Sequence, residues 1–398
     1  MAPDTAILPP VPSISVVIPA RNEGHWVRDT VEAVLSGSPG YQLEVLVVDD
    51  GSTDGSCDFL RSPSWPEGSA HVIEGEGRGS HRARNRGAAQ AGGDILVFLD
   101  AHVLPDAGWL DELVPLLRQP TVGLAGLAVR SVADPKSVGH TYVFVDESLV
   151  VGWAPQRSGG PYETPCVIAC CLATRRTCFE ELGGFDAGAI RWGLEDVELS
   201  LRAWFLGYRC LVSPCAQVAH YFKQNGRNYS VSWEEYDRNL LRCVLTYFSG
   251  RHLAGVLAGI RGRENFARSL RQVLSDSDFW LRREDLRARF CREDTWYFRR
   301  FADDLTVFLQ RIAEIGCGPY GGLVEGRKGT PCLACGGSNH GPQRNCLLCD
   351  MVLPPASGSD WQRVPTPLAM DLSSCGRCGA PRPTGGRFCG QCGVRVAA

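Results

Sequence analysis

The 398-residue chain contains no run that approaches the roughly 18 consecutive apolar residues a membrane-spanning helix requires. Residues 1–12 also lack the basic segment and the apolar segment of a secretory signal peptide. The formal net charge is only −3, so no overall positive field is available to attract nucleic acid. From these absences we expect a cytoplasmic protein with no membrane span and no nucleic-acid partner.

A disulfide framework is also missing, although the chain has 18 cysteines. Eight of them fall in four C-x-x-C pairs between Cys332 and Cys392, and the other ten are scattered without a pattern. In an unexported protein, paired C-x-x-C steps favour metal ligands, and scattered cysteines favour small buried apolar residues. With 44% hydrophobic and 21% charged residues, the composition is that of a globular protein and excludes general disorder.

Short apolar, β-branched runs alternate with helix-patterned segments in the first hundred residues. Residues 13–19, 43–48 and 95–99 are predicted strands, and residues 22–35 are a predicted helix. This alternation predicts an α/β fold with a mostly parallel sheet covered on both faces. Ligands of such sheets bind beyond the carboxyl ends of the strands. We therefore expect the polar clusters at 19–23, 49–54 and 100–102, which follow these strands, to meet at one site.

A carboxylate and an imidazole two residues apart follow the third predicted strand. From one turn, Asp100 and His102 can both reach a single divalent ion, and a histidine ligand favours a transition metal such as Mn²⁺ over Mg²⁺. Such an ion can neutralise the diphosphate leaving group of a nucleotide sugar. Taken alone, these two residues favour a solvated turn that binds no metal over a metal site.

The order of motifs along residues 13–223 resembles family 2 glycosyltransferases of the GT-A fold. The two nucleotide-binding loops would be P-A-R-N-E at 19–23 and V-D-D-G-S at 48–52. The third element, D-A-H at 100–102, is the D-x-H variant found in polypeptide N-acetylgalactosaminyltransferases. Five further motifs resemble that family: R-A-R at 82–84, G-W-L at 108–110, L-G-G-F-D at 182–186, W-G-L-E-D at 192–196 and V-A-H-Y-F at 218–222. The resemblance implies a Rossmann-like GT-A sheet and a UDP-sugar donor.

The resemblance also implies roles for particular residues. His220 would join Asp100 and His102 as a third metal ligand, although a lone histidine after a strand also fits a core position. Arg78 and Arg82 would lie near the diphosphate as cationic groups, or else belong to a solvated basic turn. The residues that would contact the nucleotide sugar are Pro19, Arg21, Glu23, Asp49, Asp50, Arg78, Arg82, Asp100, Ala101, Gly184 and Trp192.

Glu195 and Asp196 stand where family 2 enzymes carry the base that takes a proton from the acceptor. The polypeptide transferases have Glu-Asn here and retain anomeric configuration, whereas family 2 enzymes with Glu-Asp generally invert. We therefore expect inversion with Asp196 as base; a helix cap favoured by the helix dipole is the structural alternative. A second departure is Cys170-Cys171, which replaces Gly-Gly in the stretch that lines the sugar pocket of that family.

The rest of the chain divides by composition. We expect a catalytic domain at 1–231, a helical extension at 232–316, linkers at 317–330 and 352–373, and two zinc ribbons at 331–351 and 374–398. The spacing C-x2-C-x10-C-x2-C occurs twice and suits two tetrahedral, structural Zn²⁺ sites; redox dithiols are the alternative. The predicted zinc ligands are Cys332, Cys335, Cys346, Cys349, Cys375, Cys378, Cys389 and Cys392.

Together these features predict a metal-dependent transferase that moves a sugar from a UDP-sugar to a peptide or protein side chain. The zinc ribbons would hold that acceptor. A glycan, a polysaccharide precursor or a small molecule is the alternative acceptor. A non-catalytic zinc-ribbon adaptor with a degenerate core is a further alternative. Against it stands the presence of Asp50, Asp100, His102, Glu195 and His220, some of which a decayed site should have lost.

Overall fold

The computed structural model describes residues 8–66, 68, 70–223, 232–316, 330–331 and 338–339. Within these ranges no helix is long and apolar enough to cross a membrane. The tail contributes one short antiparallel pair, β13 (Thr330–Pro331) with β14 (Ser338–Asn339). All eight cysteines predicted to bind zinc lie outside the described residues.

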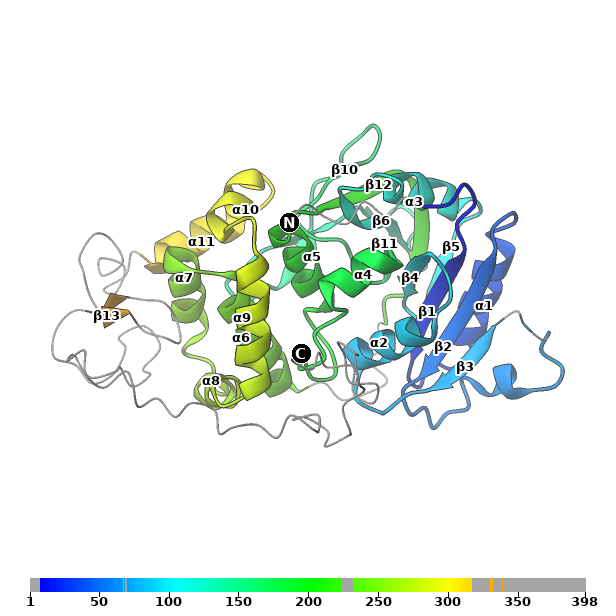
Figure 1. The fold of residues 1–398 in the computed structure, drawn as a ribbon, viewed down its shortest axis with the longest axis horizontal. Helices are drawn as coiled ribbons and strands as arrows, with labels where there is room; N and C mark the ends of the chain where they lie inside the picture. Colours follow the sequence, from blue (N-terminus) through cyan, green and yellow to red (C-terminus); the bar gives the residue numbers. More distant parts are fainter. Residues whose placement is uncertain are drawn as a thin grey trace.

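One large sheet forms the centre of the molecule (Figure 1). Its main strand order is β10-β12-β6-β11-β4-β1-β2-β3, with β5 paired to β12 and β7 paired to β6. The strands are β1 (Ile14–Ala20), β2 (Leu43–Asp49), β3 (His71–Glu74), β4 (Ile95–Leu99), β5 (Val103–Pro105), β6 (Val122–Ser131), β7 (Val138–Gly139), β10 (Tyr162–Glu163), β11 (Cys171–Arg175) and β12 (Arg209–His220). A separate hairpin joins β8 (Tyr142–Phe144) and β9 (Val151–Trp153).

The α/β class is confirmed, and the sheet is mixed in direction. Strands β4, β1, β2 and β3 run parallel, as the alternating pattern predicts. Strand β11 lies antiparallel to both β4 and β6. An apolar run marks a buried strand but carries no information about its direction, so the sequence could not show this reversal.

Helices cover both faces of the sheet because successive strand residues point to opposite sides. In β1, Val17 belongs to one apolar core, while Val16 and Ile18 belong to the other. Helices α1 (Trp26–Ser36) and α3 (Trp109–Leu117) pack into the second core. Helices α2 (Ser80–Gln90), α4 (Arg176–Leu182) and α5 (Glu195–Phe205) pack into the first.

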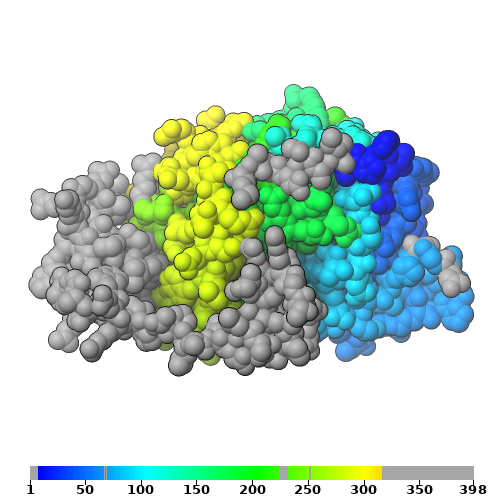
Figure 2. Space-filling model, in the orientation of Figure 1, coloured from blue at the N-terminus to red at the C-terminus, as the bar shows by residue number. Residues whose placement is uncertain are grey.

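The segment after the sheet is helical, as predicted, and lies beside α5 (Figure 1). It comprises α6 (Trp233–Tyr247), α7 (Gly250–Ile260), α8 (Phe266–Leu274), α9 (Ser277–Arg289), α10 (Asp294–Arg300) and α11 (Thr306–Gly316). In Figure 2 its yellow surface directly adjoins the green surface of the core.

Buried polar contacts fasten this extension to α5. Glu198 of α5 accepts hydrogen bonds from the Tyr247 hydroxyl at 2.6 Å and from Arg282 at 3.2 Å. Arg242 of α6 makes a bidentate pair with Asp186, at 2.8 and 3.0 Å, in the loop before α5. Because Glu198 lies within α5 and Asp186 lies in the loop before it, these contacts hold both segments against the extension.

Most of the scattered cysteines are buried, as expected of small apolar residues. The exceptions among the described residues are Cys215 and Cys291, which are exposed.

Candidate active site

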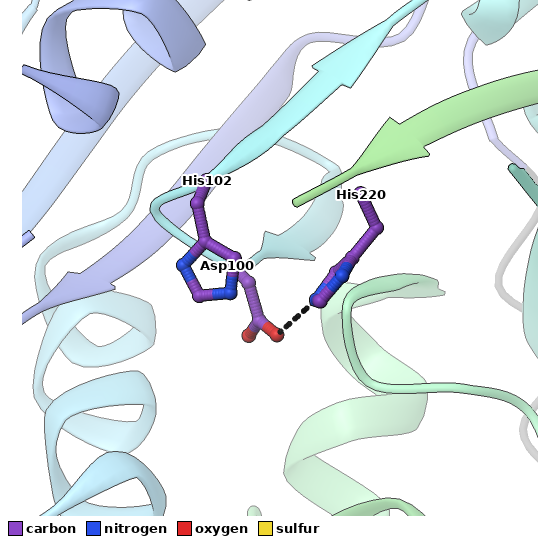
Figure 3. A group of neighbouring side chains, drawn as sticks. All are labelled: Asp100, His102 and His220. Atoms are coloured by element: carbon purple, nitrogen blue, oxygen red, sulfur yellow. Dashed lines mark ion pairs between the residues drawn. The ribbon is translucent and has the colours of Figure 1, made fainter. Parts of the chain in front are cut away.

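A carboxylate and two imidazoles meet where β4 and β12 end (Figure 3). Asp100 directly follows β4, and His102 directly precedes β5. Strand β12 pairs antiparallel with β5 so that His220 lies opposite Val103, and the Tyr221 N–H donates to the His102 carbonyl at 3.1 Å. This pairing brings one ligand atom from each of Asp100, His102 and His220 within 4.8 Å of the others.

The charge states of this cluster suit a divalent cation. Burial would by itself raise the pKa of Asp100, but His220, Arg84 and His102 outweigh burial and hold that pKa below its usual range. Burial lowers the pKa of His220 despite its Asp100 neighbour, 3.6 Å away, and so favours the neutral ring. An ionised carboxylate and neutral imidazoles are the forms that bind metal, and two nitrogens with one oxygen suit a transition metal such as Mn²⁺.

The buried cation beside this cluster is Arg84, which the sequence analysis did not select. Its guanidinium lies 2.6 Å from Asp100 and 3.3 Å from Glu195. The two arginines that the resemblance implied, Arg82 and Arg78, both contact Glu76. The distances are 3.3 Å for Arg82 and 3.9 Å for Arg78. The buried residues of α2 are His81, Ala83, Arg84, Gly87 and Ala88, so the packing of this helix turns Arg84, and not Arg82, toward the core.

The loops after β1 and β2 are tied together by hydrogen bonds. Arg21 donates to the carbonyls of Asp50 and Gly77 at 3.2 and 3.3 Å. The Asn22 N–H donates to the Ser52 hydroxyl at 3.1 Å. Pro19 is the penultimate residue of β1 and pairs with Val48 of β2. The polar clusters predicted from the sequence therefore do meet at one edge of the sheet.

Asp49, the last residue of β2, and Asp50, which follows it, both accept hydrogen bonds from backbone N–H groups. Asp50 accepts from the N–H groups of Gly79 at 2.7 Å and Arg78 at 3.2 Å, and burial raises its pKa. Asp49 accepts from the Ser52 N–H at 2.8 Å and from Arg61 at 3.0 Å. The Asp50 carboxylate therefore holds the loop that precedes α2, and the Asp49 carboxylate holds the segment that follows β2.

Glu195 and Asp196 begin α5 but have different surroundings. Glu195 accepts from the Gly193 N–H at 2.8 Å and the Ser80 hydroxyl at 3.1 Å, and His81 lies 3.6 Å away. Burial would raise the pKa of Glu195, but His81 and Arg84 outweigh it and keep the pKa low. Glu195 is therefore an ionised carboxylate held in place by its hydrogen bonds and by the neighbouring charges.

Asp196 remains partly open to solvent and accepts from its neighbour, the Val197 N–H, at 2.9 Å. Burial, and next the charge of Glu195, raise the pKa of Asp196 to about 7. A carboxylate with a pKa near neutrality is suited to take a proton from a hydroxyl group.

The remaining predicted donor contacts have structural partners. Gly184 has φ +69°, and a Cβ there would lie 2.7 Å from the Asn85 side-chain oxygen. Trp192 packs near the ring of Tyr236, with centroids 6.3 Å apart, and Ala101 is buried under the cluster. Glu23 is buried and contacts His102 and Lys223.

Cys170 lies beside the cluster and was noted in the sequence only as a departure from Gly-Gly. Its carbonyl accepts the Asp100 N–H at 3.2 Å. Burial, followed by the charges of Asp100 and Asp196, raises its thiol pKa, so the sulfur stays protonated. This state agrees with a packing role and opposes a nucleophilic one.

The chain is similar in sequence to known protein families and to individual known proteins. Residues 15–183 match the family described as "Glycosyl transferase family 2", and residues 153–225 match "N-terminal domain of galactosyltransferase". Polypeptide N-acetylgalactosaminyltransferase 13 of Rattus norvegicus is 32% identical over 238 residues, which cover 54% of this chain and 42% of that protein. The inactive polypeptide N-acetylgalactosaminyltransferase-like protein 5 of Macaca fascicularis is 31% identical over 257 residues, covering 59% of this chain and 57% of that protein.

Among solved structures, GalNAc-T7 with UDP, GalNAc and Mn²⁺ superposes with a TM-score of 0.60 at 25% identity. The match covers 74% of this chain and 57% of that chain. The chain spans about two fifths of the length of the first curated relative. The predicted fold and its relation to polypeptide N-acetylgalactosaminyltransferases are thereby confirmed.

Proposed function

We propose that this chain transfers a sugar from a UDP-sugar to a peptide or protein side chain in a metal-dependent reaction, on a GT-A core similar to glycosyltransferase family 2. The observation that carries the proposal is the Asp100, His102 and His220 cluster at the sheet edge. A divalent ion held there would neutralise charge on the diphosphate leaving group. The GalNAc-T7 structure, which contains UDP and Mn²⁺, supports the donor and the metal.

The neighbouring side chains have separate tasks in this mechanism. Arg84 holds the Asp100 carboxylate, and Glu195, fixed by Gly193 and Ser80, holds Arg84 in turn. Asp196 takes the proton of the acceptor hydroxyl as its oxygen forms a bond to the anomeric carbon. The bond from that carbon to the diphosphate breaks, and its electron pair leaves with UDP. Direct displacement of this kind inverts the anomeric centre.

The proposal is tested first by donor hydrolysis without an acceptor. We expect slow, Mn²⁺-dependent hydrolysis of one UDP-sugar, abolished by EDTA and by His102→Ala. His71→Ala, which removes an exposed histidine on β3, serves as the matched control and should leave the rate unchanged. If no nucleotide sugar is bound or hydrolysed with any divalent metal, the adaptor alternative replaces this proposal. That alternative has support from the relative named as inactive.

The acceptor is tested second. Polypeptide transferases among the relatives support a protein acceptor, and mass spectrometry of peptide libraries incubated with the active donor should reveal modified side chains. Modification of glycans or small molecules alone would favour the alternative acceptor class. NMR of the anomeric proton in the product separates inversion from retention.

A further inference from the structure

Glu23 contacts both His102 of the candidate metal cluster and Lys223, which is 200 residues away in the sequence. Its carboxylate is only 7% exposed and lies in the loop between β1 and α1. One oxygen lies 3.1 Å from Nδ1 of His102, and the other accepts a hydrogen bond from Nζ of Lys223 at 2.7 Å.

Oε2 of Glu23 and Nδ1 of His102 face each other, and each is the polar partner available to the other. Both atoms are buried away from solvent, and neither has a hydrogen-bond partner among the described residues other than the atom it faces at 3.1 Å. A buried imidazole nitrogen that faces a carboxylate oxygen is satisfied when that nitrogen carries the proton and donates it to the oxygen. Nε2 of His102 is then left with its lone pair free. In Figure 3 one ring nitrogen of His102 faces the side of Asp100 and His220, and the other faces away.

We propose that Glu23 is a positioning residue that fixes the ring of His102 with its proton on Nδ1 and thereby presents Nε2 to a divalent cation, while Lys223 fixes Glu23. The proposal rests on the proposed function and changes the role that resemblance gave to Glu23. Both of its oxygens are engaged within the protein, so neither is directed to a nucleotide sugar. Carboxylate partners of this kind orient histidine ligands in metal sites generally.

The first test measures Mn²⁺ binding to the full chain from the electron paramagnetic resonance signal of free Mn²⁺. Glu23→Gln should weaken Mn²⁺ binding about 10- to 100-fold, the range for removal of such a partner. Glu32→Gln, which removes one exposed carboxylate on α1, should not change it. Unchanged Mn²⁺ affinity in Glu23→Gln overturns the proposal.

Two further variants separate positioning from charge. Glu23→Asp keeps the charge but withdraws the oxygen from His102, so it should also weaken binding; wild-type affinity here would mean that charge alone matters. Glu23→Gln combined with Lys223→Met removes the lysine that the first variant leaves unpaired. We expect binding to stay weak in this double variant. Recovery would show that Glu23 only neutralises Lys223, and would overturn the positioning role.

A metal-free measurement keeps this proposal distinct from the proposed function. In ¹⁵N-histidine NMR spectra of the EDTA-treated chain, His102 should be the tautomer protonated at Nδ1, assigned by its loss in His102→Asn. Glu23→Gln should produce a mixture of tautomers, and a single unchanged tautomer would overturn the proposal. If the wild-type chain binds no metal but shows this tautomer change, the proposed function fails and the contact between Glu23 and His102 stands. Thermal melting without metal checks that each variant is folded.

Discussion

Replacement of Asp196 by asparagine should stabilise the metal-free protein at alkaline pH while slowing transfer. The pKa of Asp196 rises from an ordinary 3.8 to about 7 because of burial and the charge of Glu195. Three units correspond to about 4 kcal/mol at 1.36 kcal/mol per unit. Because Asp196 keeps some contact with solvent, we expect about 2–3 kcal/mol.

The direction in which the free energy of unfolding changes with pH follows from proton linkage. The folded state holds the Asp196 proton up to about pH 7, whereas the unfolded chain releases it near 3.8. Stability from this group is therefore complete below about pH 4 and is lost as pH rises through 7. Asparagine is neutral at every pH, so the advantage of the variant should be absent near pH 4 and reach its full size by about pH 8.5.

Urea unfolding in EDTA at pH 4.5, 6.5 and 8.5 measures this difference in the free energy of unfolding. Asp303→Asn, an exposed carboxylate after α10, is the control and should show no such dependence. If Asp196→Asn is no more stable than the wild type at pH 8.5, the charge of Asp196 is not costly and the argument for its raised pKa is wrong. Transfer by the variant should fall about 10²- to 10⁴-fold, the usual contribution of a general base.

Three other outcomes follow from the described contacts and from the sequence. Arg84→Met leaves the carboxylates of Asp100 and Glu195 without their shared cation and should cost about 3–5 kcal/mol of unfolding free energy, measured with urea; a loss below 1 kcal/mol would contradict this. Metal analysis of the full chain should give about two zinc ions, as two four-cysteine sites require; a folded tail without zinc would refute the ribbons. Deletion of residues 330–398 should reduce transfer to a protein acceptor and spare donor hydrolysis, and equal loss of both would mean that the tail supports the fold.

The sequence alone was enough to predict the parallel strands β1, β2 and β4 and the motif of Asp100 and His102 that follows β4. Apolar runs of β-branched residues predicted β1, β2 and β4 nearly to the residue, because burial on both faces leaves a continuous apolar pattern. Asp100 and His102 could be paired because both belong to one short turn. These are local properties, and a local pattern is enough to reveal them.

Only the tertiary structure decided which distant side chains share the site. His220 reaches His102 because β12 pairs with β5 in one register. Arg84, and neither Arg78 nor Arg82, reaches Asp100 because the rotation of α2 on the sheet turns that side chain inward. The different roles of Glu195 and Asp196, adjacent in sequence, arise in the same way. Charge pairing depends on distance and burial, which packing sets between segments up to two hundred residues apart, and no local pattern records them.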